Sequence, residues 1–171
     1  VQLRDVLDDR SRMLMALPAG LLGVLGGLSA LAMADTFLAW WHRTPFGKED
    51  PYFGLDASFY VFEYPIWQLV VSFLLTALSF SLIAALVVHF AMGALIPGRG
   101  RGATMPAPTR RHLAVLIGLI LVVYGLQNLL DRYGLLLNTG TLFTGLHYTD
   151  EHARVGAKLI VAVVAFIVAA L

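Results

Sequence analysis

Long apolar runs occupy most of this chain and restrict it to a membrane fold. A run of about 18 or more apolar residues with almost no charge is typical of a helix that crosses the bilayer. We therefore predict an all-α fold, a polytopic transmembrane helical bundle with four spans in one transmembrane domain. The expected spans are residues 13–41, 65–96, 112–131 and 151–171. The last apolar run stops without a polar flank, so we expect this chain to be a piece of a longer protein.

Composition agrees with a lipid environment and excludes several function classes. Charged residues make up 13% of the chain, against about 25% in a soluble domain. The net charge of +1 predicts no nucleic-acid partner, and the absence of cysteine excludes disulfides and thiolate metal sites in this piece. No nucleophile elbow, P-loop or zincin motif is present. We predict no catalytic residue, no cofactor and no metal in this piece. The sequence leaves open whether the whole protein is an enzyme and favours the reading that it is not.

The distribution of Lys and Arg predicts how the chain threads the membrane. The connection at 97–112 carries four arginines and no acidic residue, which places it in the cytoplasm. The connection at 42–64 carries more acids than bases, so it and the segment 131–150 are expected on the other side. Glycine and proline in the cytoplasmic connection predict a loop there, with membrane lipid as a contact.

Small residues follow one face of the first predicted span. They recur at helical spacing and include a GxxxG pair: Gly20, Gly23, Gly27, Ala30 and Ala34. Small faces allow helix backbones to approach closely in lipid. This face is therefore predicted to pack either within the bundle or against another subunit.

The first outer connection is rich in aromatic residues that a plain linker would leave exposed. The candidate partner-docking residues are Phe53, Phe59, Tyr60, Phe62 and Tyr64. Exposed apolar patches of this kind mark interaction sites. We expect the patch to pack against the other outer segment, the lipid interface or an outer domain. Asp50 and Asp56 are expected to cap the turns that hold it.

Two further polar features have alternative readings. Asp35 lies close to the end of the first span, and Arg132, at the outer end of the third span, is its best candidate partner for an ion pair. Proton or ion handling is the other reading of Asp35. The group His147, Asp150, Glu151 and His152 is read as helix capping rather than as a metal site.

Two separated loop motifs carry a resemblance to a known family. The first is Phe46-Gly-Lys-Glu-Asp-Pro-Tyr-Phe-Gly-Leu-Asp56, followed by Phe59-Tyr-Val-Phe-Glu-Tyr-Pro65. The second is Asp131-Arg-Tyr133, followed by Gly145-Leu-His-Tyr-Thr-Asp150. Together they resemble uncharacterised protein family 0182, a family of bacterial integral membrane proteins. The Asn138-Thr-Gly-Thr turn departs from the family pattern.

The resemblance implies spans three to six of a seven-span protein in the bacterial plasma membrane. Two spans would precede this piece, and a further span and a large extracytoplasmic domain would follow it. The resemblance also implies other membrane protein subunits as partners, among them a membrane-anchored protease of the PDZ type. It implies no reaction.

The sequence therefore favours a non-catalytic membrane scaffold or complex component that presents its outer loops and an outer domain to a partner. The alternative is a transporter or channel component. A transporter would be expected to carry charges near the middle of its spans, and these spans are almost free of ionisable groups.

Overall fold

The computed structural model divides the chain into two compact units, Val1–Arg43 and Thr44–Leu171. It describes residues 33–91, 105–137 and 153–171, together with positions 20, 23, 24, 26–28 and 31. All secondary structure in these residues is helical, apart from an isolated bridge between Glu49 and Asp56. The fold class was predicted correctly as all-α.

The first unit contains α2 (Ala34–Trp41). Its last turn gathers three aromatic rings, with Phe37 stacked on Trp41 at 6.1 Å between ring centroids. The guanidinium of Arg43 lies over the Trp40 ring at 5.2 Å and donates to the Trp40 carbonyl at 3.3 Å. Such a tryptophan pair beside a cation is typical of a membrane–water interface.

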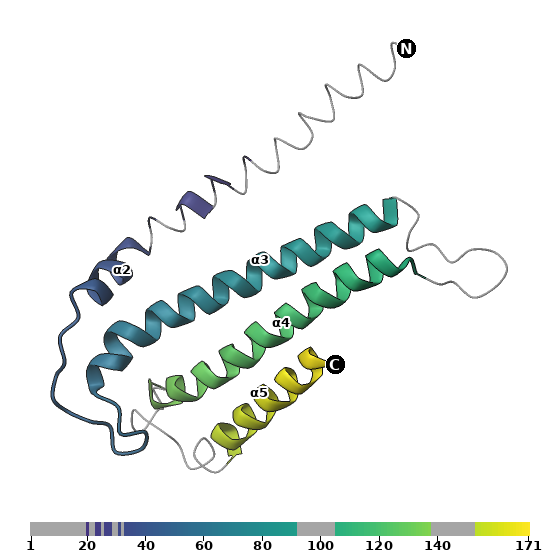
Figure 1. The fold of residues 1–171 in the computed structure, drawn as a ribbon. Helices are drawn as coiled ribbons and strands as arrows, with labels where there is room; N and C mark the ends of the chain where they lie inside the picture. Colours follow the sequence, from purple (N-terminus) through teal and green to yellow (C-terminus); the bar gives the residue numbers. More distant parts are fainter. Residues whose placement is uncertain are drawn as a thin grey trace. The chain divides into compact units, whose positions relative to one another are not determined.

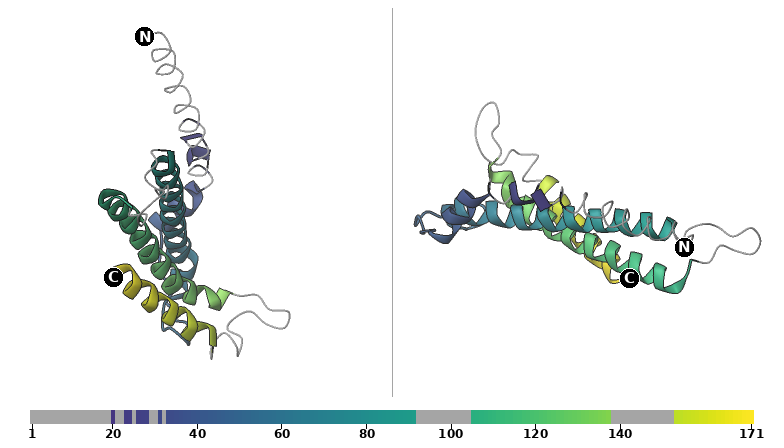
Figure 2. Two further views of the ribbon diagram at one scale, coloured as in Figure 1. Left: turned by 90° about the vertical axis from the view of Figure 1, so that its right-hand side faces the viewer. Right: turned by 90° about the horizontal axis from the view of Figure 1, so that it is seen from above.

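The second unit consists of three long helices with a short turn at one end. Its elements are η1 (Phe59–Glu63), α3 (Tyr64–Ala91), α4 (Ala107–Gly134), η2 (Leu135–Leu137) and α5 (Val155–Ala170). Figures 1 and 2 show α4 lying between α3 and α5, antiparallel to both. The start of α3, the end of α4 and the start of α5 therefore meet at one end of this unit, which we call the loop end.

The second helix begins before the predicted start at residue 65. Helical structure starts at Ala57, and Phe59–Glu63 forms a π-helical turn that runs into α3. The amide of Tyr64 donates to the Phe59 carbonyl five residues earlier. In a regular α-helix the Pro65 ring would collide with a carbonyl of the preceding turn, and a widened turn gives that ring room. The prediction of Pro65 as the first helical residue was wrong.

The third helix is longer than predicted at both ends. It begins at Ala107 and ends at Gly134, whereas the expected bounds were 112 and 131. Pro108 is accommodated because the first amides of a helix need no partner, and Arg110 donates its amide to the Pro106 carbonyl at 3.0 Å. Arg110 and Arg111 are therefore helical rather than part of a loop.

Two of the described helices are long and apolar enough to cross a membrane, Phe59–Ala91 and Ala107–Leu137. The third, α5, is a shorter apolar helix. Part of the predicted first span, including Ala30, lies outside the described residues. The total of four spans stays a prediction.

Close packing between α4 and α5 relies on small residues. Ala162 is fully buried and Ala165 nearly so. Gly125 of α4 faces Phe166, and a Cβ at Gly125 would lie 2.7 Å from the nearest ring carbon. Glycine fits here because the Phe166 ring occupies the space of a side chain, and a larger residue would have to displace that ring.

Candidate functional site

The loop before η1 is anchored by the carboxylate of Asp50. This group accepts hydrogen bonds from the amides of Tyr52, Phe53 and Leu55 at 2.6–2.9 Å and from the Tyr60 hydroxyl at 2.9 Å. Partial burial disfavours the charged form, but the four hydrogen bonds outweigh it, so the pKa of Asp50 lies below its ordinary value. The prediction that Asp50 caps a turn is confirmed.

Asp56 closes the same loop from its other end. Its carboxylate accepts from the amides of Phe46 at 3.1 Å, Gly47 at 2.7 Å and Ser58 at 2.8 Å. The bond to Ser58 caps the first helical turn, and the left-handed backbone of Gly47, with φ at 69°, favours glycine at that position. The predicted capping role of Asp56 is also confirmed.

Hydrogen bonds to Ser58, Phe46 and Gly47 lower the pKa of Asp56 to about 2. In an unfolded chain the pKa of aspartate is about 4. Because the folded pKa is the lower one, the stabilisation is present above about pH 4 and is lost as the pH falls through about 2. We expect an NMR titration of the Asp56 carboxyl carbon to show a midpoint near 2. A midpoint near 4 would contradict the anchoring role, and Asp56→Asn identifies the signal.

Aromatic rings connect this loop to the end of α4. Tyr133 contacts Phe53, with ring centroids 4.8 Å apart, and Phe59, at 5.6 Å. Phe62 packs edge-on against Phe46 at 5.6 Å, and Tyr60 is buried. The expected patch therefore packs partly against the other outer segment. A role of these rings in docking a partner stays a prediction.

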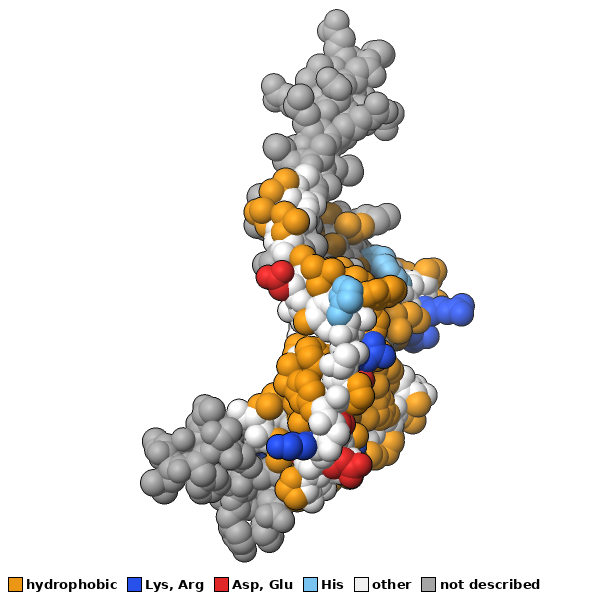
Figure 3. Space-filling view, turned by 90° about the vertical axis from the view of Figure 1, so that its left-hand side faces the viewer, with side chains coloured by type: hydrophobic (Ala, Val, Ile, Leu, Met, Phe, Trp, Pro, Cys, Tyr) orange, Lys and Arg blue, Asp and Glu red, His pale blue; other side chains and the backbone are white. Residues whose placement is uncertain are grey.

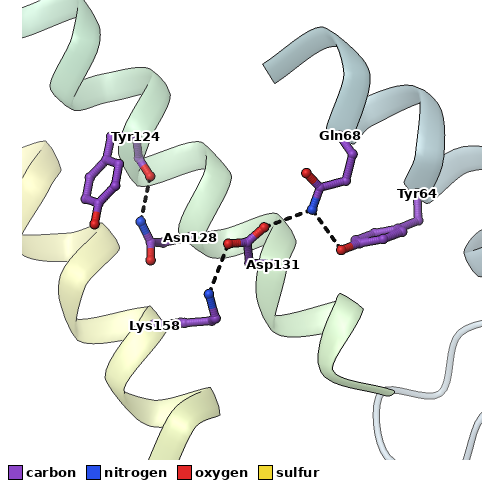
Figure 4. Close-up of polar contacts among 6 residues, drawn as sticks. All are labelled: Tyr64, Gln68, Tyr124, Asn128, Asp131 and Lys158. Atoms are coloured by element: carbon purple, nitrogen blue, oxygen red, sulfur yellow. Dashed lines mark hydrogen bonds and ion pairs between the residues drawn. The ribbon is translucent and has the colours of Figure 1, made fainter. Parts of the chain in front are cut away.

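A polar cluster at the loop end joins all three long helices through Asp131 of α4 (Figure 4). Gln68 of α3 donates its amide to Asp131 Oδ1 at 2.8 Å and to the Tyr64 hydroxyl at 2.7 Å. Lys158 of α5 donates to Asp131 Oδ2 at 3.0 Å. Both carboxylate oxygens are thus engaged, each by a different neighbouring helix. Asp131 acts as a clamp between them.

A glycine beside the clamp leaves room for Tyr64. A Cβ at Gly134 would overlap the Tyr64 hydroxyl, so the absence of a side chain lets Tyr64 reach Gln68. One turn before the clamp, Asn128 is buried and donates its amide to the Tyr124 carbonyl at 2.9 Å.

Gln68, Asp131 and Lys158 were not predicted to be partners. A signal was available, because Gln68 is a lone amide within an apolar run and Lys158 directly precedes another. Isolated polar residues in such runs are costly in lipid and usually find partners across helices.

Arg132 points into the aromatic part of the loop end. Its guanidinium lies 4.7 Å from the Tyr133 ring centroid and donates to the Tyr133 hydroxyl at 2.7 Å. Asp35 belongs to the other unit, so the ion pair between Asp35 and Arg132 stays a prediction. Among the described residues, Arg132 Nε is buried without a hydrogen-bond partner.

The remaining predicted sites are only partly described. A Cβ at Gly20, Gly23 or Gly27 would meet no described atom within 4 Å, and packing through this face and Ala34 stays a prediction. His147, Asp150, Glu151 and His152 lie outside the described residues. In the described part of the chain no three metal-ligating side chains gather.

The whole chain matches one protein family. The family model described as Uncharacterised protein family (UPF0182) covers residues 1–171. The chain belongs to the UPF0182 family. This confirms the resemblance carried by the two loop motifs.

Several curated UPF0182 relatives also match nearly the whole of this chain. A UPF0182 protein of Saccharopolyspora erythraea is 39% identical over 164 residues, which cover 95% of this chain and 17% of that protein. Those of Corynebacterium efficiens and Thermobifida fusca are 37% and 36% identical and cover 98% of the chain. No solved structure matches. This chain therefore spans about a sixth of the length of these three relatives, 17% or less in each case.

Proposed function

We propose that this chain is part of a non-catalytic membrane scaffold that presents its outer loops, and an outer domain of the whole protein, to a partner. The observation that supports this is that three aspartate carboxylates at the loop end are each engaged in several hydrogen bonds or ion pairs. Asp50, Asp56 and Asp131 together accept bonds from loop amides, a tyrosine hydroxyl, Gln68 and Lys158. Carboxylates engaged in this way hold structure and have little capacity left for catalysis.

The proposed location is the bacterial plasma membrane, with several spans. Large apolar side chains are exposed along α3, among them Phe73, Phe80 and Phe90. Figure 3 shows one face of the molecule, on which hydrophobic side chains are extensive and charged groups are fewer. A surface of this kind suits contact with lipid.

The proposed sidedness puts 97–112 in the cytoplasm and both 42–64 and 131–150 outside. The chain has no cysteine, so a single introduced cysteine is the only thiol in it, and its labelling reports the side of the membrane on which that residue lies. Lys48→Cys is expected to react with an impermeant thiol reagent in intact cells, and Gly100→Cys only after lysis. Lys48 is preferable to Gly47 because the left-handed backbone of Gly47 would strain a cysteine. The reverse labelling pattern would overturn the sidedness.

The proposed partner is another membrane protein, and a membrane-anchored protease of the PDZ type is the first candidate. Side chains that are exposed at the loop end, such as Tyr52 and Val61, can be changed with little loss of internal packing, which for Tyr52 is an edge-on ring contact with Phe53. In the whole protein, Tyr52→Ser with Val61→Ser is expected to keep the folded yield and lower co-purification of the protease at least fivefold.

A matched inward pair separates docking from folding. Phe59→Ser with Phe62→Ser removes rings that contact Tyr133 and Phe46, and it is expected to lower the folded yield. If the Tyr52 and Val61 pair leaves co-purification unchanged, the loop end is not the docking surface. A transport role would then become the first alternative.

A further inference from the structure

Two histidines from neighbouring helices meet at the end opposite to the loop end. His89 lies in the last described turn of α3, and His112 lies near the start of α4. His89 Nε2 and His112 Nδ1 are 3.3 Å apart, and the two rings are steeply inclined at 74°. They belong neither to the clamp nor to the loop described above.

The separation of the two nitrogens suits a tetrahedral metal ion. Nitrogens that each lie about 2.0–2.1 Å from a tetrahedral zinc ion are about 3.3–3.4 Å from one another. Neutral imidazole is the preferred nitrogen ligand of Zn²⁺, Ni²⁺ and Cu²⁺. To bind one shared ion, both nitrogens must present their lone pairs to it, and their distance of 3.3 Å already suits this.

A buried hydroxyl lies behind one of the two ligands. Thr109 Oγ1 is 3.4 Å from His89 Nδ1, and Thr109 is only 5% exposed. When the hydroxyl oxygen accepts a hydrogen bond from Nδ1–H, the lone pair of the His89 ring is left on Nε2, the nitrogen that faces His112. Metal-binding histidines typically donate their second nitrogen in this way, which fixes the tautomer.

The surroundings leave room for the remaining coordination positions. An open groove of about 580 Å³ runs beside His112, lined by Ala107, Pro108, Arg111, His112 and Val115. Water could complete a tetrahedral shell from this side. The neighbouring Arg110 and Arg111 are positively charged and weaken the attraction of a cation, so the site is expected to be weaker than a closed site with four protein ligands.

We propose that His89 and His112 form a binding site for a divalent transition-metal ion, with Thr109 as the positioning residue and water as the remaining ligands. Such an ion would join α3 and α4 at the end where no clamp comparable to Asp131 is described. This inference is independent of the proposed scaffold role, because it concerns other residues at the other end of the unit.

The test is zinc binding by the full chain, prepared without a polyhistidine tag in mild detergent. Equilibrium dialysis against Zn²⁺ with elemental analysis is expected to show one more bound ion per chain in the wild type than in His112→Ala. The dissociation constant should rise at least tenfold in His112→Ala and about 10–100-fold in Thr109→Val, which keeps the side-chain shape.

His42→Ala is the matched control for adventitious binding, because His42 is an exposed histidine of the other unit that bonds only the Leu38 carbonyl among the described residues. It is expected to bind zinc like the wild type. With cobalt as the probe, the wild type should show ligand-field absorption that His89→Ala lacks. Helicity and elution volume of each variant without metal establish that it folds. Equal zinc binding by the wild type and His112→Ala would overturn the proposal.

Discussion

Replacing Asp131 with alanine is expected to lower the unfolding free energy by about 2 kcal/mol. An exposed ion pair contributes about 1 kcal/mol or less, and removal of one partner from a buried pair costs about 3–5 kcal/mol. The side chains of Asp131 and Lys158 are 29% and 27% exposed, which places this pair between the two cases. The variant also leaves the Gln68 amide without one of its acceptors. Unfolding in mild detergent measures the change.

A double variant separates the clamp from general damage. Asp131→Leu with Lys158→Met removes both charges together, so no unpaired ammonium remains between α4 and α5. It is expected to be more stable than Asp131→Ala alone, because the cost of an unpaired charge exceeds the net contribution of the pair. A double variant that is no more stable than the single one would show that Lys158 and Asp131 do not act together.

Replacing Gly125 with alanine is expected to destabilise the contact between α4 and α5 by about 1–3 kcal/mol. The added Cβ would lie 2.7–3.1 Å from three ring atoms of Phe166, so the ring or one helix has to move. Gly118→Ala is the matched control on the same helix. Its Cβ would meet only the Ala169 carbonyl at 3.5 Å, an ordinary contact.

The two glycine variants are expected to have different effects on stability, a loss for Gly125→Ala and none for Gly118→Ala. Alanine favours a helix over glycine by about 1 kcal/mol, so Gly118→Ala should be neutral or slightly stabilising. Thermal unfolding of both variants in the same detergent provides the comparison. Phe166→Leu should relieve much of the effect of Gly125→Ala. Equal destabilisation at both glycines would contradict the packing of Gly125 against Phe166.

Local features of the chain could be predicted because their causes are close together in sequence. The turn anchored by Asp50 depends mainly on amides two to five residues later, a pattern that aspartate forms readily in turns. The apolar runs likewise indicate helices through their length and composition. Helix ends were less predictable, because a proline is compatible with more than one position near the start of a helix. Pro65 follows a helical turn that begins before it, whereas Pro108 lies in the first turn of α4.

The amino-acid sequence by itself determined the helical class, the family and the two aspartate-anchored turns. Only the tertiary structure decided which helix faces meet, as with Asp131 between Gln68 and Lys158 or Gly125 against Phe166. The physical reason is that α3 and α5 are apolar around nearly their whole circumference. Their periodicity therefore does not reveal how each helix is rotated about its axis, and that rotation is set by close packing and by the few polar groups that need a partner across the interface.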